Sequence, residues 1–214
     1  AHMSGDYSRK RFNPEKHYQG VLRQQGRVDL DADWNEYVDL QDRRWRAETI
    51  DVVGRSGVPD ETPDGFKIAV SGGELTVGQG RMYVDGYVAE NHGTAPAFEP
   101  TLEEGYGTAA LPVKNQPYGG PVTVPAQVRS LVYLDVWRRE VTHLQAPDLI
   151  EPAVNVDSTT RYQTAWQVRV LANIPPDITC DTPLSDIPGW PTGNRSSSAR
   201  LTTTTVAVTT EPDP

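Results

Sequence analysis

Acidic side chains alternate from Asp29 to Glu36 (DLDADWNE), the pattern that opens a calcium-binding EF-hand loop. Such a loop also needs a glycine at its sixth position and a bidentate glutamate at its twelfth, where this chain has Trp34 and Leu40. A helix that begins at Asp31 would also spread the alternate carboxylates apart. We therefore interpret these acids as the first turn of a helix, where the helix dipole favours negative charge, and expect no metal site.

Two carboxylates in a cleft can hydrolyse glycosidic bonds when they lie about 5–10 Å apart. Asp135 and Glu140 fall on adjacent expected strands, but a chain with 29 acidic residues brings such pairs together by chance. The sequence has no nucleophile elbow, phosphate-binding loop or HExxH zinc motif. Its single cysteine, Cys180, and its four scattered histidines lack metal-ligand spacing. We therefore predict no catalytic residue, no cofactor and no metal, and hence no enzyme.

Five tryptophans and nine tyrosines could supply stacking platforms for sugars. Trp137 and Trp166 lie in the middle of expected strands, a position that favours the core. Trp34 and Trp45 lie on an expected helix and are interpreted as core or interface residues. Trp190, between a glycine and a proline, is the one of the five for which exposure is most expected.

Composition narrows the classes of partner. The chain has 214 residues and a formal net charge of −9, which repels nucleic-acid phosphates and anionic lipid headgroups. No apolar run reaches the ~18 residues needed to span a bilayer, and the N-terminal region lacks the apolar stretch of a signal peptide. We therefore expect no nucleic acid and no membrane as partners. Eighteen glycines and eighteen prolines favour a β-rich body with many turns.

The clearest expected element is a helix over Asp31–Val53, stopped by Gly54. Apolar side chains recur at helical spacing in a stripe made of Leu30, Trp34, Val38, Trp45 and Val52. Charges four residues apart predict intrahelical ion pairs, namely Asp39–Arg43 and Asp42–Arg46. Because a helix of this length needs a tertiary or intersubunit surface for its stripe, Trp34, Val38 and Trp45 are the candidate interface residues.

Short alternating stretches follow the helix and predict strands over 66–70, 74–77, 80–89, 128–137 and 161–172. Residues 139–144 are expected to pair with 128–137 or to continue it past a bulge. Gly86, inside the third stretch, is interpreted as a bulge or a close approach of the backbone. The segment from Gly78 to Gly80 is interpreted as a hairpin turn. Residues 91–127 form a long connection rich in proline and glycine.

We therefore predict an α+β fold that is mostly β, an antiparallel β-sandwich or distorted barrel with one long N-terminal amphipathic helix. The chain divides into an arm and helix over 4–54, a β-rich body over 55–172, and a Pro/Ser/Thr-rich linker or loosely ordered tail over 173–214. The arm is expected to lie along another surface, because exposing its aromatic residues would be unfavourable; these are Tyr7, Phe12 and Tyr18.

Several stretches carry a resemblance to a known family. They are SGDYSRKRFNPEKHY (4–18), GVLRQQGRVDLDADWNE (20–36), GRMYVDG (80–86), LVYLDVWRREVT (131–142) and TRYQTAWQVRVL (160–171). Together they resemble DUF6519, an uncharacterised bacterial domain family whose genes tend to lie in extracellular contractile injection system clusters. The pattern is also similar to N-terminal modules of phage tail-fibre or baseplate proteins. The resemblance covers about residues 4–172 and implies no catalytic residue.

The resemblance implies a non-enzymatic structural or attachment domain of a contractile injection system or phage-tail-like particle, associated with a fibre, spike or baseplate. The implied partners are protein components of the particle and, by analogy with tail-fibre modules, further copies of the chain in a trimer. We expect assembly in the bacterial cytoplasm, on a particle that can be released from the cell. Two alternatives stay open. One is a carbohydrate-binding module for cell-surface glycans, with Tyr106, Tyr118 and Trp190 as its candidate residues, and the other is part of a tail-associated polysaccharide-degrading enzyme.

Overall fold

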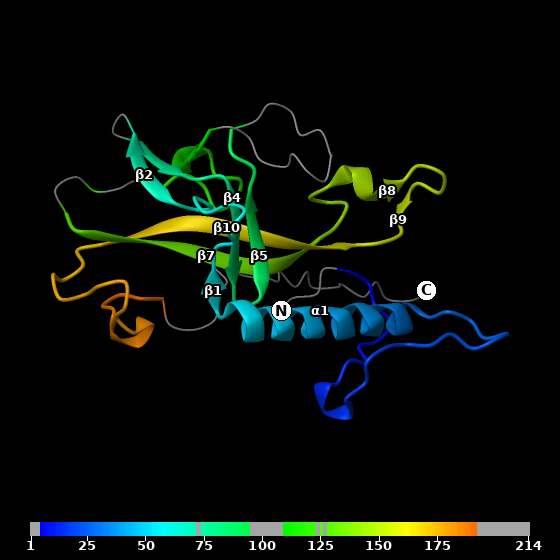
Figure 1. Ribbon diagram of the computed structural model, residues 1–214. Coiled ribbons are helices and arrows are strands. Elements are labelled where there is room, and N and C mark those ends of the chain that lie inside the picture. The colour runs from blue at the N-terminus through cyan, green and yellow to red at the C-terminus, as the bar shows by residue number, and fades with distance from the viewer. Residues whose placement is uncertain (1–4, 72–73, 95–108, 123–124, 126–127, 192–214) are drawn as a thin grey trace, which may run out of the picture.

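The fold is α+β and mostly β, with one long N-terminal helix and several small antiparallel sheets, which confirms the predicted class. A computed structural model describes residues 5–71, 74–94, 109–122, 125 and 128–191 (Figure 1). In this view the helix α1 (Asp31–Val53) runs below a long two-stranded ribbon, and the smaller sheets lie mainly above it.

The ribbon consists of β7 (Ser130–Val141) and β10 (Arg161–Ala172), which pair along their whole length. Side chains alternate along a strand, so the even-numbered residues of both strands share one side, the core side, and the odd-numbered residues share the other, the outer side. On the core side Trp166 is only 3% exposed. Its ring meets Phe66 edge-on at 5.0 Å between centroids, and its indole N–H donates to the Glu90 carbonyl at 2.7 Å. Burial of Trp166 confirms the prediction for this residue.

Two three-stranded sheets cover the core side and complete the hydrophobic core. One contains β1 (Ser56–Gly57), β4 (Gly80–Val84) and β5 (Tyr87–Asn91), and the other β2 (Ile68–Ser71), β3 (Glu74–Val77) and β6 (Leu111–Pro112). A fourth, two-stranded sheet pairs β8 (Ile150–Glu151) with β9 (Val156–Asp157). Single turns of 3₁₀ helix occur at Pro14–Lys16, Val113–Asn115, Pro147–Leu149 and Leu184–Asp186. The buried core residues are Phe66, Val77, Ala89, Val113, Trp166 and Val168.

The strand predicted over 80–89 is two strands, because the chain turns at Asp85 and Gly86. Both residues have positive φ, 48° and 78°, as a two-residue hairpin turn of type I′ requires. The turn also brings the backbone close to α1, since a Cβ added at Gly86 would lie 2.8 Å from the Arg46 carbonyl oxygen. The bulge interpretation was therefore wrong, whereas the close approach is confirmed.

The segment from Gly78 to Gly80 is not a hairpin turn, because the strands on its two sides belong to different sheets. Gly78 continues the pairing of β2 with β3, since its N–H donates to the Lys67 carbonyl at 2.8 Å. Gly80 begins β4 in the other sheet. The segment therefore carries the chain from one sheet to the next.

The helix begins and ends where the sequence predicts. Gly54 leaves the helical conformation with φ 96°, and its N–H donates to the Ile50 carbonyl at 3.0 Å. Of the helical residues only Ala32 and Leu40 are buried, so α1 lies on the surface of the body. Among the described residues, no helix combines the length and the apolar character that crossing a membrane requires.

Residues after the ribbon form a second, smaller hydrophobic cluster. Ile174, Ile178 and Ile187 are buried there, together with the partly buried Leu131, Leu171 and Trp190. Arg129 donates to the carbonyl oxygens of Pro175 and Ile178 and so ties this segment to the start of β7. The first part of the predicted linker or tail thus packs against the ribbon, while residues 192–214 of it lie outside the described residues.

Candidate functional site

The candidate interface residues lie on α1, and two of them face solvent. The side chains of Trp34 and Trp45 are 61% and 70% exposed, whereas Val38 is partly buried. Val52, two turns beyond Trp45, is 80% exposed, and Tyr37 contacts Trp34 with ring centroids 6.1 Å apart. We call Trp34, Tyr37, Trp45 and Val52 the tryptophan face. The core interpretation of its two tryptophans is wrong for this chain, and the interface interpretation stays a prediction.

The tryptophan face points outward because α1 is fixed to the body through charged residues. Asp42 forms an ion pair with Arg138 of β7 at 2.6 Å. The Arg46 guanidinium lies 4.1 Å above the centre of the Tyr87 ring and donates to the Asp85 carbonyl at 3.2 Å. Asp42 and Arg46 therefore reach across to the ribbon and to the β4–β5 turn, instead of forming the predicted pair with each other.

The same junction encloses a cavity of about 250 Å³ between the arm, α1 and the start of β10. Its lining includes Tyr7, Trp34, Val38, Asp39, Thr160 and Tyr162. Burial raises the pKa of Asp39 above its ordinary value, and the positive charges of Lys10 and Arg138 oppose that shift. The pKa of Tyr162 is also raised, mainly by burial and to a smaller extent by the negative charge of Asp39. The Arg138 guanidinium covers the Tyr162 ring at 4.2 Å.

The acidic first turn of α1 binds the N-terminal arm. Asp31 accepts hydrogen bonds from the Ser8 N–H at 2.9 Å and the Ser8 hydroxyl at 2.6 Å. The hydrogen bond from the hydroxyl has the larger effect, and both bonds lower the pKa of Asp31. Arg11 forms an ion pair with Asp33. The acids that resembled a calcium loop thus hold the arm against the helix.

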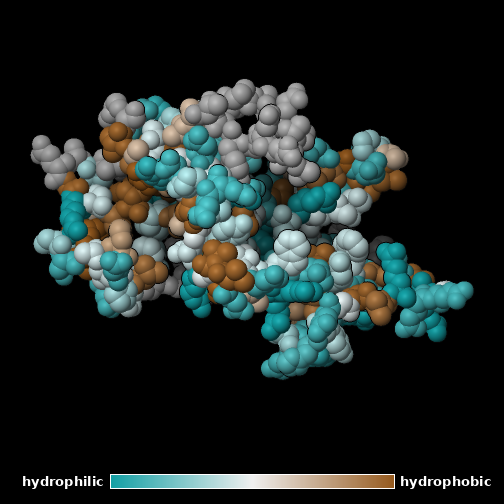
Figure 2. Space-filling view, in the orientation of Figure 1, coloured by the Kyte–Doolittle hydropathy of each residue, from teal (hydrophilic) through white to brown (hydrophobic). Residues whose placement is uncertain are grey.

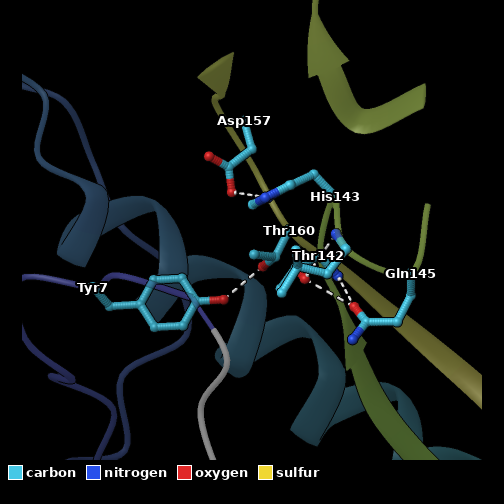
Figure 3. Close-up of polar contacts among 7 residues, drawn as sticks. Tyr7, Thr142, His143, Gln145, Asp157 and Thr160 are labelled. Carbon is cyan, nitrogen blue, oxygen red and sulfur yellow. Dashed lines mark hydrogen bonds and ion pairs between the residues drawn. The ribbon is translucent and has the colours of Figure 1, made fainter. Parts of the chain in front are cut away.

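Aromatic residues of the arm differ in how far they pack. Tyr7 is partly buried, and its hydroxyl lies 2.5 Å from the Thr160 hydroxyl oxygen (Figure 3). Phe12 is also partly buried, as expected. Tyr18 is exposed, with the Lys16 ammonium 5.8 Å from its ring centre, so the expectation that all three aromatic residues pack is wrong for Tyr18.

Beyond these anchors the arm presents further apolar side chains. Leu22 is 91% exposed and Val28 is 83% exposed. A groove of about 730 Å³ lies between the segment 21–30 and the beginning of α1, where Trp34 and Tyr37 line it. In Figure 2 brown residues interrupt the teal surface in the lower right, where Figure 1 places the arm and α1. The groove therefore shares Trp34 and Tyr37 with the tryptophan face.

A polar cluster at the far end of the ribbon contains a His–Asp pair (Figure 3). The Nδ1 atom of His143 lies 2.7 Å from Asp157 of β9. A histidine held by an aspartate is found in catalytic triads. A triad also needs a nucleophilic hydroxyl or thiol that is hydrogen-bonded to the histidine. The nearby hydroxyl of Thr142 instead donates to Gln145 at 2.8 Å, and that of Thr160 is engaged by Tyr7. The pair links β9 to the end of β7, a structural role that sequence analysis missed.

The outer side of the ribbon brings together residues that the sequence left separate. Asp135 and Glu140 both belong to β7 and point to opposite sides of it. The pairing of 139–144 with 128–137 was therefore wrong, and the chain continues the same strand to Val141 without a bulge. Asp135 instead lies 3.1 Å from Arg169 on β10. Trp137 is partly buried beside Tyr118, at 6.3 Å between ring centroids.

The remaining sequence candidates occupy different places. Trp190 is partly buried against Tyr133, at 4.7 Å between ring centroids, so the expected exposure is wrong. Tyr118 packs beside the main core, and Tyr106 lies outside the described residues. Cys180 is exposed. Within the described ranges, no group of three or more His, Cys, Asp or Glu side chains is placed to hold a metal ion.

Comparison with known proteins gives one match. The model of a family of unknown function, DUF6519, matches residues 3–187. The match includes the arm, α1, the ribbon and most of the second hydrophobic cluster. Neither the curated proteins nor the solved structures contain a match.

Proposed function

The chain belongs to DUF6519, a family of unknown function, and we propose that it is a non-enzymatic attachment domain of a phage-tail-like contractile particle. In this proposal it joins a larger fibre-, spike- or baseplate-associated protein to a protein component of the particle. The tryptophan face is the observation that carries the proposal. The contractile particle comes from the family resemblance of the sequence, and the geometry supplies the surface that would dock.

Two exposed tryptophans on one helix favour a protein partner. Burying the exposed part of each ring would stabilise a complex by about 3 kcal/mol, at ~25 cal/mol per Å² of apolar surface. Trp34 and Trp45 are fixed in place because α1 is held by the Asp42–Arg138 ion pair and by Arg46. Large aromatic side chains on a rigid support are the residues that dominate binding energy in protein interfaces.

Particles assembled without the full-length protein provide the test. We expect the 214-residue chain to co-sediment with them in a saturable manner, and Trp45→Asp to weaken this binding by about 100-fold, the equivalent of ~3 kcal/mol. Leu144→Asp is the matched control, because Leu144 is also 78% exposed but lies outside the tryptophan face. Unchanged binding of the folded Trp45→Asp variant would refute the proposed docking surface.

Self-association is a further part of the proposal, with a trimer suggested by analogy to tail-fibre modules. Mass measurement by light scattering tests it, and a mass equal to one chain at all concentrations would contradict it. The same Trp45→Asp variant separates the two roles of the face. Loss of particle binding at unchanged mass would assign the face to the particle component, and loss of both would assign it to the oligomer.

A further inference from the structure

The outer side of the ribbon carries a shallow depression of about 520 Å³, away from the tryptophan face. Tyr133 and Trp137 of β7 and Gln167 and Arg169 of β10 line it, and the loop from Gly119 to Val122 forms its edge. We propose that this depression binds an acidic saccharide, with a sugar ring stacked on an aromatic side chain and its carboxylate bound by Arg169. This inference is independent of the proposed attachment function.

Both aromatic rings are braced by a second ring. Tyr133 contacts Trp190 with centroids 4.7 Å apart, and Trp137 contacts Tyr118 edge-on at 69°. Tyr133 and Trp137 lie on the same side of β7, and their Cα atoms are about 13 Å apart at ~3.3 Å of rise per residue. Rings that are already fixed lose little conformational entropy when a ligand stacks on them. A separation of this size suits an oligosaccharide of two or three units better than a single sugar.

Arg169 is oriented between the aromatic rings by its neighbours. Its Nε atom lies 3.1 Å from an Asp135 carboxylate oxygen and donates to the Gln167 side-chain oxygen at 3.0 Å. Gln167 is buried, and its amide donates to the Gly119 carbonyl at 2.9 Å, so this support is itself fixed. Both contacts of Arg169 within the described residues use Nε, which leaves its two terminal amino groups to donate to a ligand. A guanidinium held in this way suits a planar carboxylate.

The depression is open and combines flat rings with fixed hydrogen-bonding groups, which fits a chain-like, hydroxylated ligand better than a small apolar one. The net charge of −9 does not decide against an acidic sugar. At physiological ionic strength charges are screened within about 8 Å, so the local field depends on the Arg169–Asp135 pair and not on the net charge. Asp135 contacts Nε of Arg169, so a ligand carboxylate would bind through the terminal amino groups of the guanidinium.

The two faces of the ribbon keep this site separate from the attachment surface. Arg138 and Tyr162, which contact α1 or lie at its junction, project from the core side. Tyr133, Trp137 and Arg169 project from the outer side. Changes on the tryptophan face should therefore leave saccharide binding intact, and the two proposals can fail separately.

Nuclear magnetic resonance titration of the 214-residue chain tests the proposal with matched sugars. The probes are cellobiouronic acid and 3′-sialyllactose, each compared with its neutral counterpart, cellobiose or lactose. We expect saturable shifts of the Trp137 indole N–H with at least one acidic probe, and binding about 10-fold weaker with its neutral counterpart. Equal affinity for acidic and neutral sugars, or the absence of Trp137 shifts at 10 mM of both acidic probes, would overturn the proposal.

Two variants connect the binding to the depression. Arg169→Gln should weaken binding of the acidic probe by about 10- to 100-fold, the loss expected for a charged hydrogen bond, and leave neutral-sugar binding unchanged. Arg55→Gln removes the same charge from an exposed arginine that pairs with Asp85, outside the depression. Equal weakening by Arg55→Gln would assign the effect to net charge and refute the site. Trp137→Leu, with a native circular dichroism spectrum, should abolish stacking, and retained affinity in this variant would also refute it.

Discussion

The junction between α1 and the ribbon depends on Arg138, and its replacement by methionine gives a measurable prediction. Methionine replaces the apolar stem of the arginine side chain but carries no charge. The side chains of the Asp42–Arg138 pair are only 29% and 26% exposed, so Asp42 would remain without its partner in a mostly buried place. Breaking a fully buried pair costs 3–5 kcal/mol and an exposed one less than 1, so we expect about 2 kcal/mol here.

Arg138→Met also removes the contact of the guanidinium with the Tyr162 ring at 4.2 Å. Such a cation–π contact contributes about 1 kcal/mol when it is partly desolvated. The free energy of unfolding in urea should therefore fall by about 3 kcal/mol in total. Hydrogen exchange of the α1 amides should become faster, because the helix loses its main attachment to β7.

A double-mutant cycle with Asp42→Asn isolates the ion pair. We expect a coupling energy of about 1–2 kcal/mol between the two positions. Arg55→Met is the control, because the side chains of its pair with Asp85 are 80% and 55% exposed, and its effect should stay below about 0.5 kcal/mol. A coupling energy near zero between Asp42 and Arg138 would refute the reasoning that this pair positions α1.

Three further changes test other parts of the structure. Gly86→Ala should destabilise the protein by about 2 kcal/mol in urea unfolding, because the residue has φ 78° and the new methyl group would meet the Arg46 carbonyl; an unchanged midpoint would contradict the close approach. Trp166→Ala should lower the free energy of unfolding by about 3–5 kcal/mol, whereas Trp45→Asp should leave it nearly unchanged. Similar losses of stability in the two variants would refute the assignment of Trp45 to the surface. Burial raises the pKa of Asp39, so the folded state binds this proton more tightly than the unfolded state. The stability that this group contributes is present below the pKa of the unfolded state and is lost as the pH rises through the pKa of the folded state. Asp39→Asn should therefore be more stable than the original at pH 7, and the difference should shrink on acidification; a difference that grows in acid would refute this.

Helix α1 and strand β10 could be predicted to the residue because their signals are local. Helical spacing and Gly54 define α1, and strict alternation defines 161–172. The orientation of α1 could not be predicted in the same way. Periodicity shows which side chains share a face, and a tryptophan stripe usually marks the buried face. Here Asp42 and Arg46 make the contacts with the body, because their partners come from β7 and the β4–β5 turn, far along the chain.

The other differences have a local cause in one case and a long-range cause in the rest. The Asp85–Gly86 turn had a clear local signal in its two residue types, but alternation on both sides of it suggested one continuous strand. The His143–Asp157 pair and the outer-side cluster depend on pairing that single-strand patterns do not reveal. Only the register of β7 against β10 places Asp135 and Tyr133 beside Arg169, so the candidate saccharide site needed the structure.

The hydrogen bond between Tyr7 and Thr160 joins residues 153 positions apart, and this separation orders events during synthesis. The arm and α1 leave the ribosome long before Arg138, the partner of Asp42, and Thr160, the partner of Tyr7, have been translated. Contacts of such high sequence separation form late in folding because closing a long loop is entropically unfavourable. The nascent chain therefore carries the tryptophan face on a helix that lacks these two contacts until the ribbon is complete. If this face docks as proposed, late closure of the arm would delay assembly until the whole domain has folded.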